Sequence, residues 1–551
     1  MVKNIPFLFK VLVISIFPVS SFAQGDYDSR LGELQSGMER TAESLGMPVH
    51  EDWAADLSGR FDGSLSGDQS AALQLTPLRA PAPIPQVPSL PVIPPLPSDY
   101  PLPEPVSYTG TAVIAWHAVG AQLADNGWIP WADGAPTFDD ISKRVLKASV
   151  SRAYPARRAG QQSLFRDGGF ITEYERATGS SFRDGNNARY LVNGPASFAV
   201  RDRLMREAKK SLLVSSWAFY DDITGWEAAQ YLMLKKREGL EVKVIVDRKV
   251  AVGHGKRVLK LMEEAGIEVL RYDDSKRGND IWHVKMMIVD DAYAIVGGMN
   301  FGDVYSHKDP NNVKWRDTDV IYSGPAVAES RRLFARVWNA KVRENKLKFG
   351  LVSETAPSGA YQGGSARVSV IMQNPPADSN ILVSIVKAMY GATERINIEN
   401  AYFVSLPVVT KAVLDAVARG VEVNIITNSK ESIDPEGKTI VEAMYSCLMP
   451  LAEAGANIYL YQGSSTLHSK FMTVDGVFAN IGSYNLHPRG ERYDTEVNVS
   501  IIDPVSTAQL DAAFANDVAS SRRVTSPAQL GEKPGWLSSF VSEYFYAQLK
   551  K

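Results

Sequence analysis

The sequence predicts an α/β protein in which one sheet-and-helix unit occurs twice. Segments with the apolar pattern of strands and of helices follow one another in residues 197–246, and the same succession returns in residues 380–426. Strands that alternate with helices form sheets covered by helices. A polar motif recurs at nearly the same offset. These observations together indicate an internal duplication at the scale of a whole domain.

The first residues predict export. Residues 1–23 carry two lysines ahead of an apolar run and end in the small-residue pattern Ser21-Phe22-Ala23. This is typical of a secretory signal peptide cleaved after Ala23, and the apolar run is too short to span a bilayer. We therefore expect an exported protein, periplasmic or secreted. Its only cysteine is Cys447, which rules out an internal disulfide and a dithiol metal site.

The residues before the duplicated body differ from it in composition. Residues 24–76 have no strong pattern and stay unassigned. Twelve prolines fall in residues 77–107, which predicts an extended, polyproline-like linker. Residues 108–184 form a Trp-rich extension that contains Trp116, Trp128 and Trp131. Tryptophan beside an apolar segment suits a lipid interface but is more often a core residue.

We expect the body to consist of a first domain over residues 185–352, a polar linker over residues 353–365 and a second domain over residues 366–551. In the first domain the pattern predicts helices over residues 197–210 and 225–237, and strands over residues 211–220 and 240–246. In the second domain it predicts helices over residues 380–393 and 407–419, and strands over residues 396–404 and 421–426. Each second helix is followed by a glycine turn, at Gly239 and at Gly420.

The charge balance argues against a nucleic-acid partner. The chain has 59 Lys and Arg residues against 62 Asp and Glu residues, which gives a formal net charge of -3. Nucleic-acid binding normally depends on a basic surface, and the bulk charge does not supply one.

Each domain contains one copy of the motif H-x-K-x-x-x-x-D, followed by G-[GS]-x-N. A single copy is weak evidence, because a surface His and Lys produce it by chance, but two intact copies at equivalent positions indicate a working site. In an extended run, His and Lys two positions apart lie on one face. The motif residues are His283, Lys285, Asp290 and Asn300 in the first copy, and His468, Lys470, Asp475, Ser483 and Asn485 in the second.

These residue types suit chemistry on a phosphodiester. A neutral imidazole is a competent nucleophile, and a protonated one can supply a proton to the leaving alcohol. Lys285 and Lys470 can bind the non-bridging phosphate oxygens together with Asn300, Asn485 and the hydroxyl of Ser483. No carboxylate cluster of the kind needed by a two-metal phosphodiesterase accompanies the motifs, so we expect neither a metal nor another cofactor.

Each histidine needs an orienting partner on its other ring nitrogen. Candidates downstream of the first motif are Asp317 and Asp319, and candidates downstream of the second are Asp494 and Glu496. By position we select Asp319 and Glu496. The motif residues Asp290 and Asp475 fall where each strand ends, and we expect them to fix the turn and the lysine.

The two motifs resemble those of the phospholipase D superfamily. The segments GGMNFGDVY, WRDTDVIYSGPAVAE and LHSKFMTVD are similar to those of bacterial cardiolipin synthases, especially the C-type, from about residue 190 onwards. The resemblance implies two domains, each a mixed sheet flanked by helices, packed about a pseudo-twofold axis. Gly298 departs from the pattern, since many members have Ser there, and this puts one phosphate contact in doubt.

The resemblance also implies a mechanism. The two histidines would meet at one site and act through a phosphohistidine, with His283 as nucleophile and His468 as acid and then base. The acidic partners would act crosswise, Glu496 on His283 and Asp319 on His468.

The function expected is an exported phospholipase D or phosphatidyltransferase that acts on glycerophospholipids at a membrane surface. The sequence leaves open whether water or an alcohol accepts the phosphatidyl group, and it does not define the oligomeric state. The alternatives are a secreted nuclease of the same superfamily and a non-enzymatic phosphate-binding scaffold. Residues 252–257 could hold a head-group phosphate at a helix N-terminus, but we interpret them as a helix start.

Overall fold

The computed structural model describes residues 138–273, 280–355, 363–435 and 437–531. The expected signal peptide, the region 24–76, the proline-rich linker 77–107, and Trp116, Trp128 and Trp131 lie outside the described residues, as does most of the linker 353–365.

The strands of the two halves join in one 16-stranded mixed sheet. The first half contains β1 (Arg183–Val192), β2 (Ser211–Ser216), β3 (Glu241–Asp247), β4 (Glu268–Tyr272), β5 (Ile281–Trp282), β6 (Met286–Val289), β7 (Tyr293–Gly297) and β8 (Thr318–Ser323). The second half contains β9 (Ala366–Gln373), β10 (Arg395–Asn400), β11 (Glu422–Asn428), β12 (Asn457–Tyr461), β13 (Lys470–Val474), β14 (Phe478–Gly482), β15 (Asp494–Ile502) and β16 (Ser521–Arg523).

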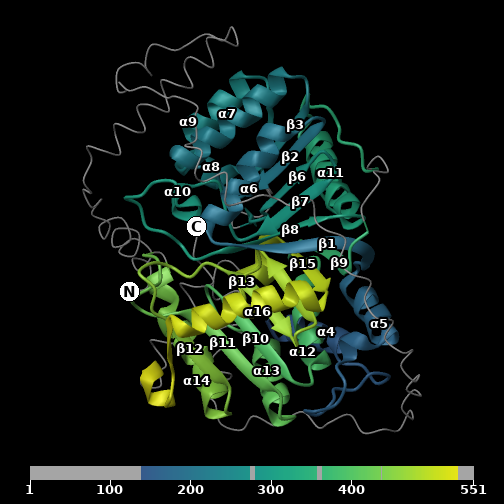
Figure 1. The fold of residues 1–551 in the computed structure, drawn as a ribbon, viewed down its shortest axis with the longest axis vertical. Coiled ribbons are helices and arrows are strands. Elements are labelled where there is room, and N and C mark those ends of the chain that lie inside the picture. Colours follow the sequence, from purple (N-terminus) through teal and green to yellow (C-terminus); the bar gives the residue numbers. More distant parts are fainter. Residues whose placement is uncertain (1–137, 274–279, 356–362, 436, 532–551) are drawn as a thin grey trace, which may run out of the picture. The chain divides into compact units, whose positions relative to one another are not determined.

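The strand order confirms the duplication. From β4 to the junction the first half runs β4-β3-β2-β6-β7-β8-β1, and from β12 to the junction the second half runs β12-β11-β10-β13-β14-β15-β9, with the short strand β16 outside β12. In each of these two runs the first three strands are parallel and the other pairings are antiparallel, whereas β16 pairs antiparallel with β12. The halves meet where β1 pairs with β9, which Figure 1 shows at the centre of the sheet. Two copies arranged in this mirrored order are related by a pseudo-twofold axis.

Helices cover both faces of this sheet. The first half has α6 (Gly194–Glu207), α7 (Ile223–Arg237), α8 (Arg248–Gly253), α9 (Lys256–Glu264), α10 (Asp303–Ser306) and α11 (Ala326–Glu344). The second half has α12 (Asn380–Gly391), α13 (Pro407–Ala418), α14 (Val441–Glu453), α15 (Arg489–Arg492) and α16 (Pro504–Ala519). Figure 1 shows the strands of the first half between α7 and α9 on one side and α11 on the other. None of the described helices combines the length and the hydropathy needed to cross a membrane.

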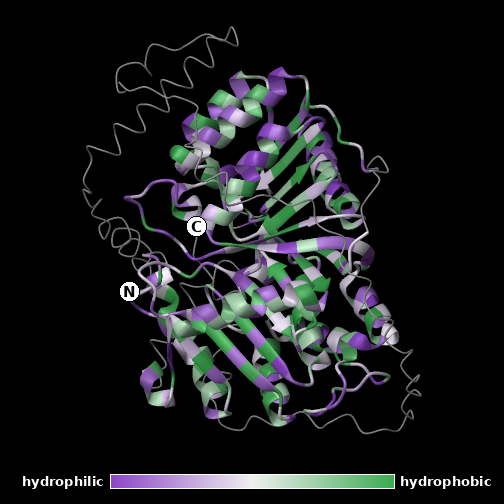
Figure 2. Ribbon diagram, in the orientation of Figure 1, coloured by the Kyte–Doolittle hydropathy of each residue, from purple (hydrophilic) through white to green (hydrophobic). Residues whose placement is uncertain are grey.

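One of the apolar clusters of the core spans both halves. It contains Phe334 and Trp338 of α11, Phe514 of α16, and strand residues that include Val296 and Val497. Figure 2 shows hydrophobic residues along the strands of both halves. Burial of this shared apolar surface holds the two halves together as one body.

The described part of the Trp-rich extension belongs to the second half. Its helices α4 (Phe138–Ser149) and α5 (Gly168–Thr178) pack against α12. Between them Phe165 stacks on Phe478, with ring centroids 4.2 Å apart. The hydroxyl of Tyr174 lies 2.8 Å from Ser500 Oγ. The segment from α4 to α5 therefore extends the hydrophobic core of the second half.

The predicted elements are present, with two differences. The expected helices correspond to α6, α7, α12 and α13, and the expected strands to β2, β3, β10 and β11. The strands expected over residues 211–220 and 396–404 end earlier, at Ser216 and Asn400. The residues that follow leave the sheet and line the site described next.

Candidate active site

The two motifs lie on equivalent extended segments, each just before a central strand. His283 and Lys285 lie between β5 and β6, whereas His468 precedes β13 and Lys470 begins it. The expectation that each pair lies within a strand was therefore wrong by a few residues. Each lysine instead folds back on its own segment. Lys285 Nζ donates to the carbonyl of His283 at 2.8 Å, and Lys470 Nζ donates to the carbonyl of His468. All four side chains are buried.

Backbone contacts join each histidine segment to the other half. The His283 amide donates to Thr495 O at 3.0 Å, and the short strand β5 runs parallel to the start of β15. In the same way, the His468 amide donates to Arg316 O at 2.6 Å, and Leu467 forms a parallel bridge with Arg316. The two motifs, far apart in sequence, therefore lie against segments that carry acidic residues of the opposite half.

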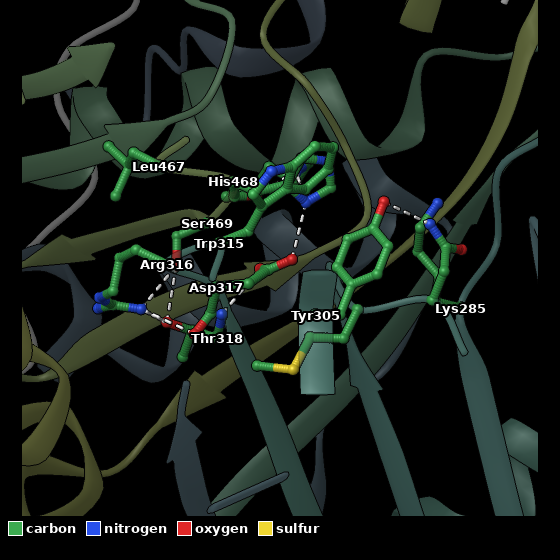
Figure 3. Close-up of polar contacts among 12 residues, drawn as sticks. Lys285, Tyr305, Trp315, Arg316, Asp317, Thr318, Leu467, His468 and Ser469 are labelled. Atoms are coloured by element: carbon green, nitrogen blue, oxygen red, sulfur yellow. Dashed lines mark hydrogen bonds and ion pairs between the residues drawn. The ribbon is translucent and has the colours of Figure 1, made fainter. Parts of the chain in front are cut away.

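Each imidazole has a carboxylate from the opposite half at Nδ1. Glu496 Oε1 lies 2.8 Å from His283 Nδ1. Asp317 Oδ2 lies 2.7 Å from His468 Nδ1, a contact drawn in Figure 3. The crosswise contact expected between Glu496 and His283 is confirmed, and His468 has a crosswise partner as well.

The partner of His468 was predicted wrongly. Asp319 does not contact His468, because it accepts a hydrogen bond from Arg201 Nη2 at 2.8 Å and forms a buried ion pair with it. The register explains the error. Gly297 pairs with Asp319 across β7 and β8, whereas Gly482 pairs with Asn498 across β14 and β15.

Two residues earlier in the chain lie Asp317, just before β8, and Glu496 in β15, and these two residues are therefore equivalent. The similar letters of WRDTDV and YDTEV suggest an alignment that is shifted by two residues. Counting from the glycine of each G-[GS]-x-N turn does not identify Asp317 either, because Asp317 lies 20 residues after Gly297 whereas Glu496 lies 14 residues after Gly482. Gly298 also matters here, because a Cβ at this position would lie 2.3 Å from Asp317 Oδ1. A glycine lets the carboxylate approach.

Asp290 and Asp475 lie away from the imidazoles. Both have positive φ, 55° and 52°, and follow a strand. Their carboxylates accept backbone N–H groups at the start of the neighbouring strand. The donors are Lys209, Lys210 and Ser211 for Asp290, and Thr393, Glu394 and Arg395 for Asp475. They fix the turn as expected, but they do not contact the motif lysines.

The residues predicted to bind phosphate differ in their surroundings. Asn300 Nδ2 donates to the hydroxyl of Tyr305 at 2.9 Å. The Ser483 hydroxyl donates to Val497 O and accepts from Val497 N. It is therefore hydrogen-bonded to the backbone of β15. Asn485 is buried, and its Oδ1 has no hydrogen-bond partner among the described residues.

The family model described as "Cardiolipin synthase, PLD-like domain" matches the chain twice, over residues 202–338 and 385–518. Each match contains one of the two motifs. The chain is a member of the phospholipase D-like family.

Individual relatives agree with this assignment. The chain is 27% identical over 409 residues to cardiolipin synthase A of Pseudomonas fluorescens, a match that covers 72% of this chain and 77% of the relative. It is 28% identical over 345 residues to the cardiolipin synthase of Halalkalibacterium halodurans, covering 61% of this chain and 67% of the relative. The crystal structure of phosphatidylserine synthase from Haemophilus influenzae Rd KW20 has the same fold, with a TM-score of 0.53 and 17% identity over 69% of this chain and 98% of that one.

Burial dominates the electrostatics of this phospholipase D-like site. It raises the pKa of Asp317 to about 6, against the opposing effect of Lys470. It also raises the pKa of Glu496 well above its usual range, against the opposing effect of Lys285. Each carboxylate also interacts with the other lysine, so the two motifs share one electrostatic site. Among the described residues, no group of three or more His, Cys, Asp or Glu side chains is placed to hold a metal ion.

Aromatic rings surround both imidazoles, and the sequence did not reveal them. The ring of Trp217 lies 6.2 Å from that of His283. Trp315 and Tyr305 lie 5.0 and 5.3 Å from His468, and Tyr402 lies 6.2 Å from it. Figure 3 shows Trp315 and Tyr305 beside His468. The aromatic residues in SSWAFY and ENAYF, which follow the matched strands β2 and β10, were the available signal.

Proposed function

We propose that this protein is an exported phosphatidyltransferase of the cardiolipin synthase type, which cleaves or exchanges the head group of a glycerophospholipid through a phosphohistidine. One observation carries the proposal: two buried histidines, each with a carboxylate from the opposite half at Nδ1, share a site with two lysines. Carboxylates at Nδ1 orient both rings so that Nε2 is the reacting nitrogen.

In the first step, His283 Nε2 attacks the phosphorus and forms a P–N bond. The P–O bond to the head-group alcohol breaks, and the leaving oxygen takes a proton from His468 Nε2. In the second step, His468 removes a proton from water or from an acceptor alcohol, whose oxygen attacks the phosphorus as the P–N bond breaks. The assignment of His283 as nucleophile follows the family pattern.

The other site residues act on charge. Lys285 and Lys470 are held beside the two imidazoles and would neutralise the non-bridging phosphate oxygens as the transition state forms. Glu496 and Asp317 would stabilise the positive charge that each ring carries in turn. Asn485, a buried residue of the second motif, would donate a hydrogen bond from its amide Nδ2 to a non-bridging phosphate oxygen.

The substrate class follows from the relatives, whose names concern phospholipid synthesis. Export follows from residues 1–23, which predict cleavage after Ala23. The N-terminal sequence of protein isolated from an outer compartment tests this part. A mature protein that begins at Gln24 supports it, and an uncleaved chain in the cytoplasm contradicts it.

The test of activity uses purified protein with phosphatidylglycerol and with phosphatidylethanolamine, and products are measured by mass spectrometry. We expect release of the head group with formation of phosphatidic acid or cardiolipin, and no loss of rate on addition of a chelator. The controls are His283→Ala and His468→Ala. Degradation of single-stranded DNA without any lipid product would overturn the lipid assignment in favour of a nuclease.

A further inference from the structure

Two surface segments flank the aromatic rings of the site, and each carries an exposed valine. The first is residues 248–257, which comprise α8 and the start of α9, and the second is residues 310–315. We call them together the site rim. Val252 in the first segment is 63% exposed and Val313 in the second is 54% exposed. A single exposed valine needs no explanation, so the case depends on where these two lie and on what accompanies them.

A row of rings connects the two segments of the rim. The ring centroid of His254, in the first segment, lies 4.8 Å from that of Tyr220. The centroid of Tyr220 lies 6.3 Å from that of Tyr305. Tyr305 in turn lies 5.0 Å from Trp315, which ends the second segment. Tyr220 and Trp315 are half-buried, whereas His254 is exposed. Partly exposed Tyr and Trp rings next to exposed apolar residues are typical of protein surfaces at a lipid interface.

The same row reaches both reacting imidazoles. Trp217 lies 5.8 Å from His254 and 6.2 Å from His283. Trp315 lies 5.0 Å from His468. The first segment of the rim is therefore separated from His283 by one ring, that of Trp217, and the second segment reaches His468 directly through Trp315. A molecule that touches the rim is next to the phosphodiester site.

The rim is basic in a chain that is acidic as a whole. Between Asp247 and Glu263 the chain has no acidic residue. The first segment exposes four cationic side chains, those of Arg248, Lys249, Lys256 and Arg257, and the second segment exposes Lys314. Neighbouring acids partly offset this charge, because Arg248 pairs with Asp273 and Arg257 Nε lies 3.9 Å from Asp221.

The helix N-terminus within the rim does not explain this charge. The first amides of α9 are already used, since the Asp221 carboxylate accepts from Arg257 N at 3.1 Å and from Val258 N at 2.7 Å. A carboxylate in this place excludes a bound phosphate, so residues 252–257 are a helix start, as expected. The exposed Lys and Arg side chains of the rim therefore do not balance the charge of an anion bound at the N-terminus of α9.

We propose that the site rim docks on an anionic phospholipid surface, with Val252 and Val313 entering the interface and the basic side chains meeting the head groups. Exposed apolar side chains ringed by Lys and Arg, with aromatic residues behind them, match the two forces that hold proteins on such surfaces, apolar burial and attraction to anionic lipids. Docking here would deliver a lipid from the surface straight to the two histidines. This inference rests on the proposed function and names the partner of the same site.

The test compares the full chain with the double variant Val252→Asp/Val313→Asp on two forms of one lipid. One form is phosphatidylglycerol in vesicles, and the other is short-chain phosphatidylglycerol kept monomeric in solution. We expect the double variant to lose about tenfold in vesicle sedimentation and in the rate on vesicles, because two apolar contacts become charged. The rate on the monomeric lipid should stay within about twofold, because the two substituted valines are not among the residues that contact the reacting imidazoles.

Two matched variants sharpen the result. Val505 at the start of α16 is 68% exposed and lies outside the rim, so Val505→Asp should change neither rate. Lys256→Gln should weaken binding to vesicles that contain anionic lipid by about fivefold, and leave the weak binding to neutral phosphatidylcholine vesicles unchanged.

The docking proposal would be overturned if the double variant sedimented with vesicles and processed them as the wild type does. It would also be overturned by an equal loss on both forms of the lipid. Wild-type protein that processed neither form would instead reject the proposed function. Sedimentation needs no turnover, so it would still decide for or against docking in that case.

Discussion

The two halves of the molecule place a carboxylate at the same position of the sheet, Asp317 in the first and Glu496 in the second, but surround it differently. Asp317 follows Arg316, a buried residue whose guanidinium donates to Asp517 at 2.6 Å and to Ser469 Oγ at 3.2 Å. Glu496 follows Thr495, which has no such charge. The two imidazoles therefore sit in unequal surroundings, as expected if one attacks phosphorus while the other transfers protons.

The framework around the site has changed much less. Strand order, the parallel bridge beside each histidine, and the aspartate that follows each central strand are the same in both halves. The duplicated backbone therefore sets where the reacting groups lie, while the neighbouring side chains set what each one does.

The largest effect is expected from the imidazoles themselves. Replacing either histidine by Ala should lower turnover by about 10⁴-fold or more. A phosphatidyl ester of p-nitrophenol separates the roles, because its leaving group needs no proton. With this substrate His468→Ala should release about one p-nitrophenol per enzyme and then stop, whereas His283→Ala should release none. The opposite result would exchange the two roles.

The next largest effect concerns stability at the position that we predicted wrongly. Asp319→Asn leaves the buried guanidinium of Arg201 without its counter-charge. Breaking a buried ion pair in this way costs about 3–5 kcal/mol in the free energy of unfolding. Denaturant unfolding measures this loss, and the turnover of the folded fraction should change little. A stable variant without activity would instead place Asp319 in the chemistry.

Asp317 serves as the comparison for Asp319, because both are buried carboxylates near the start of β8. Asp317→Asn should raise the free energy of unfolding, whereas Asp319→Asn should lower it. Burial raises the pKa of Asp317 from an ordinary value of 3.8 to about 6, so the folded state disfavours the charged form. The carboxyl therefore lowers the wild-type stability as the pH rises through this interval, by about 3 kcal/mol once it is fully ionised. Asp317→Asn should gain stability over the wild type between pH 4 and pH 7, as measured by unfolding at each pH. A pH-independent difference would contradict this.

The two orienting carboxylates should have a smaller effect on turnover than the rings. Glu496→Gln and Asp317→Asn keep the size of each side chain but remove the charge that orients the imidazole. Loss of such a partner lowers activity by about 10–100-fold. If the two halves differ in task, Glu496→Gln should slow the burst with the p-nitrophenyl ester, and Asp317→Asn should slow mainly the later release. Equal effects on both phases would weaken the comparison.

The smallest effect, equal in both halves, is expected at the turns. Asp290→Asn and Asp475→Asn keep a residue type that tolerates positive φ but replace a charged acceptor of backbone N–H groups. Each should lower stability by about 1 kcal/mol without changing turnover per folded molecule. Melting curves of the two variants give the comparison, and a loss confined to one half would show that the framework is not equivalent.

The sequence alone predicted much of this molecule. The repeated motif located the histidines and lysines, and the periodicity located the paired helices and strands around them. It did not reveal Asp317, because the segments between each glycine turn and the next strand differ in length, and only the strand register resolves this. It also missed the packing of α4 and α5 on α12, since neighbours in space need not follow chain order. Trp315 lies too far in sequence from His468 for any local pattern to connect them.

The crosswise bridges beside β15 and Leu467 make the catalytic centre and the seam between the halves one and the same structure. A fragment that contains a single half would have one of the two histidines but would lack the carboxylate that orients its imidazole. The catalytic site is therefore complete only after both halves have been synthesised and have folded against each other. A chain that lacks either half would therefore have no complete site.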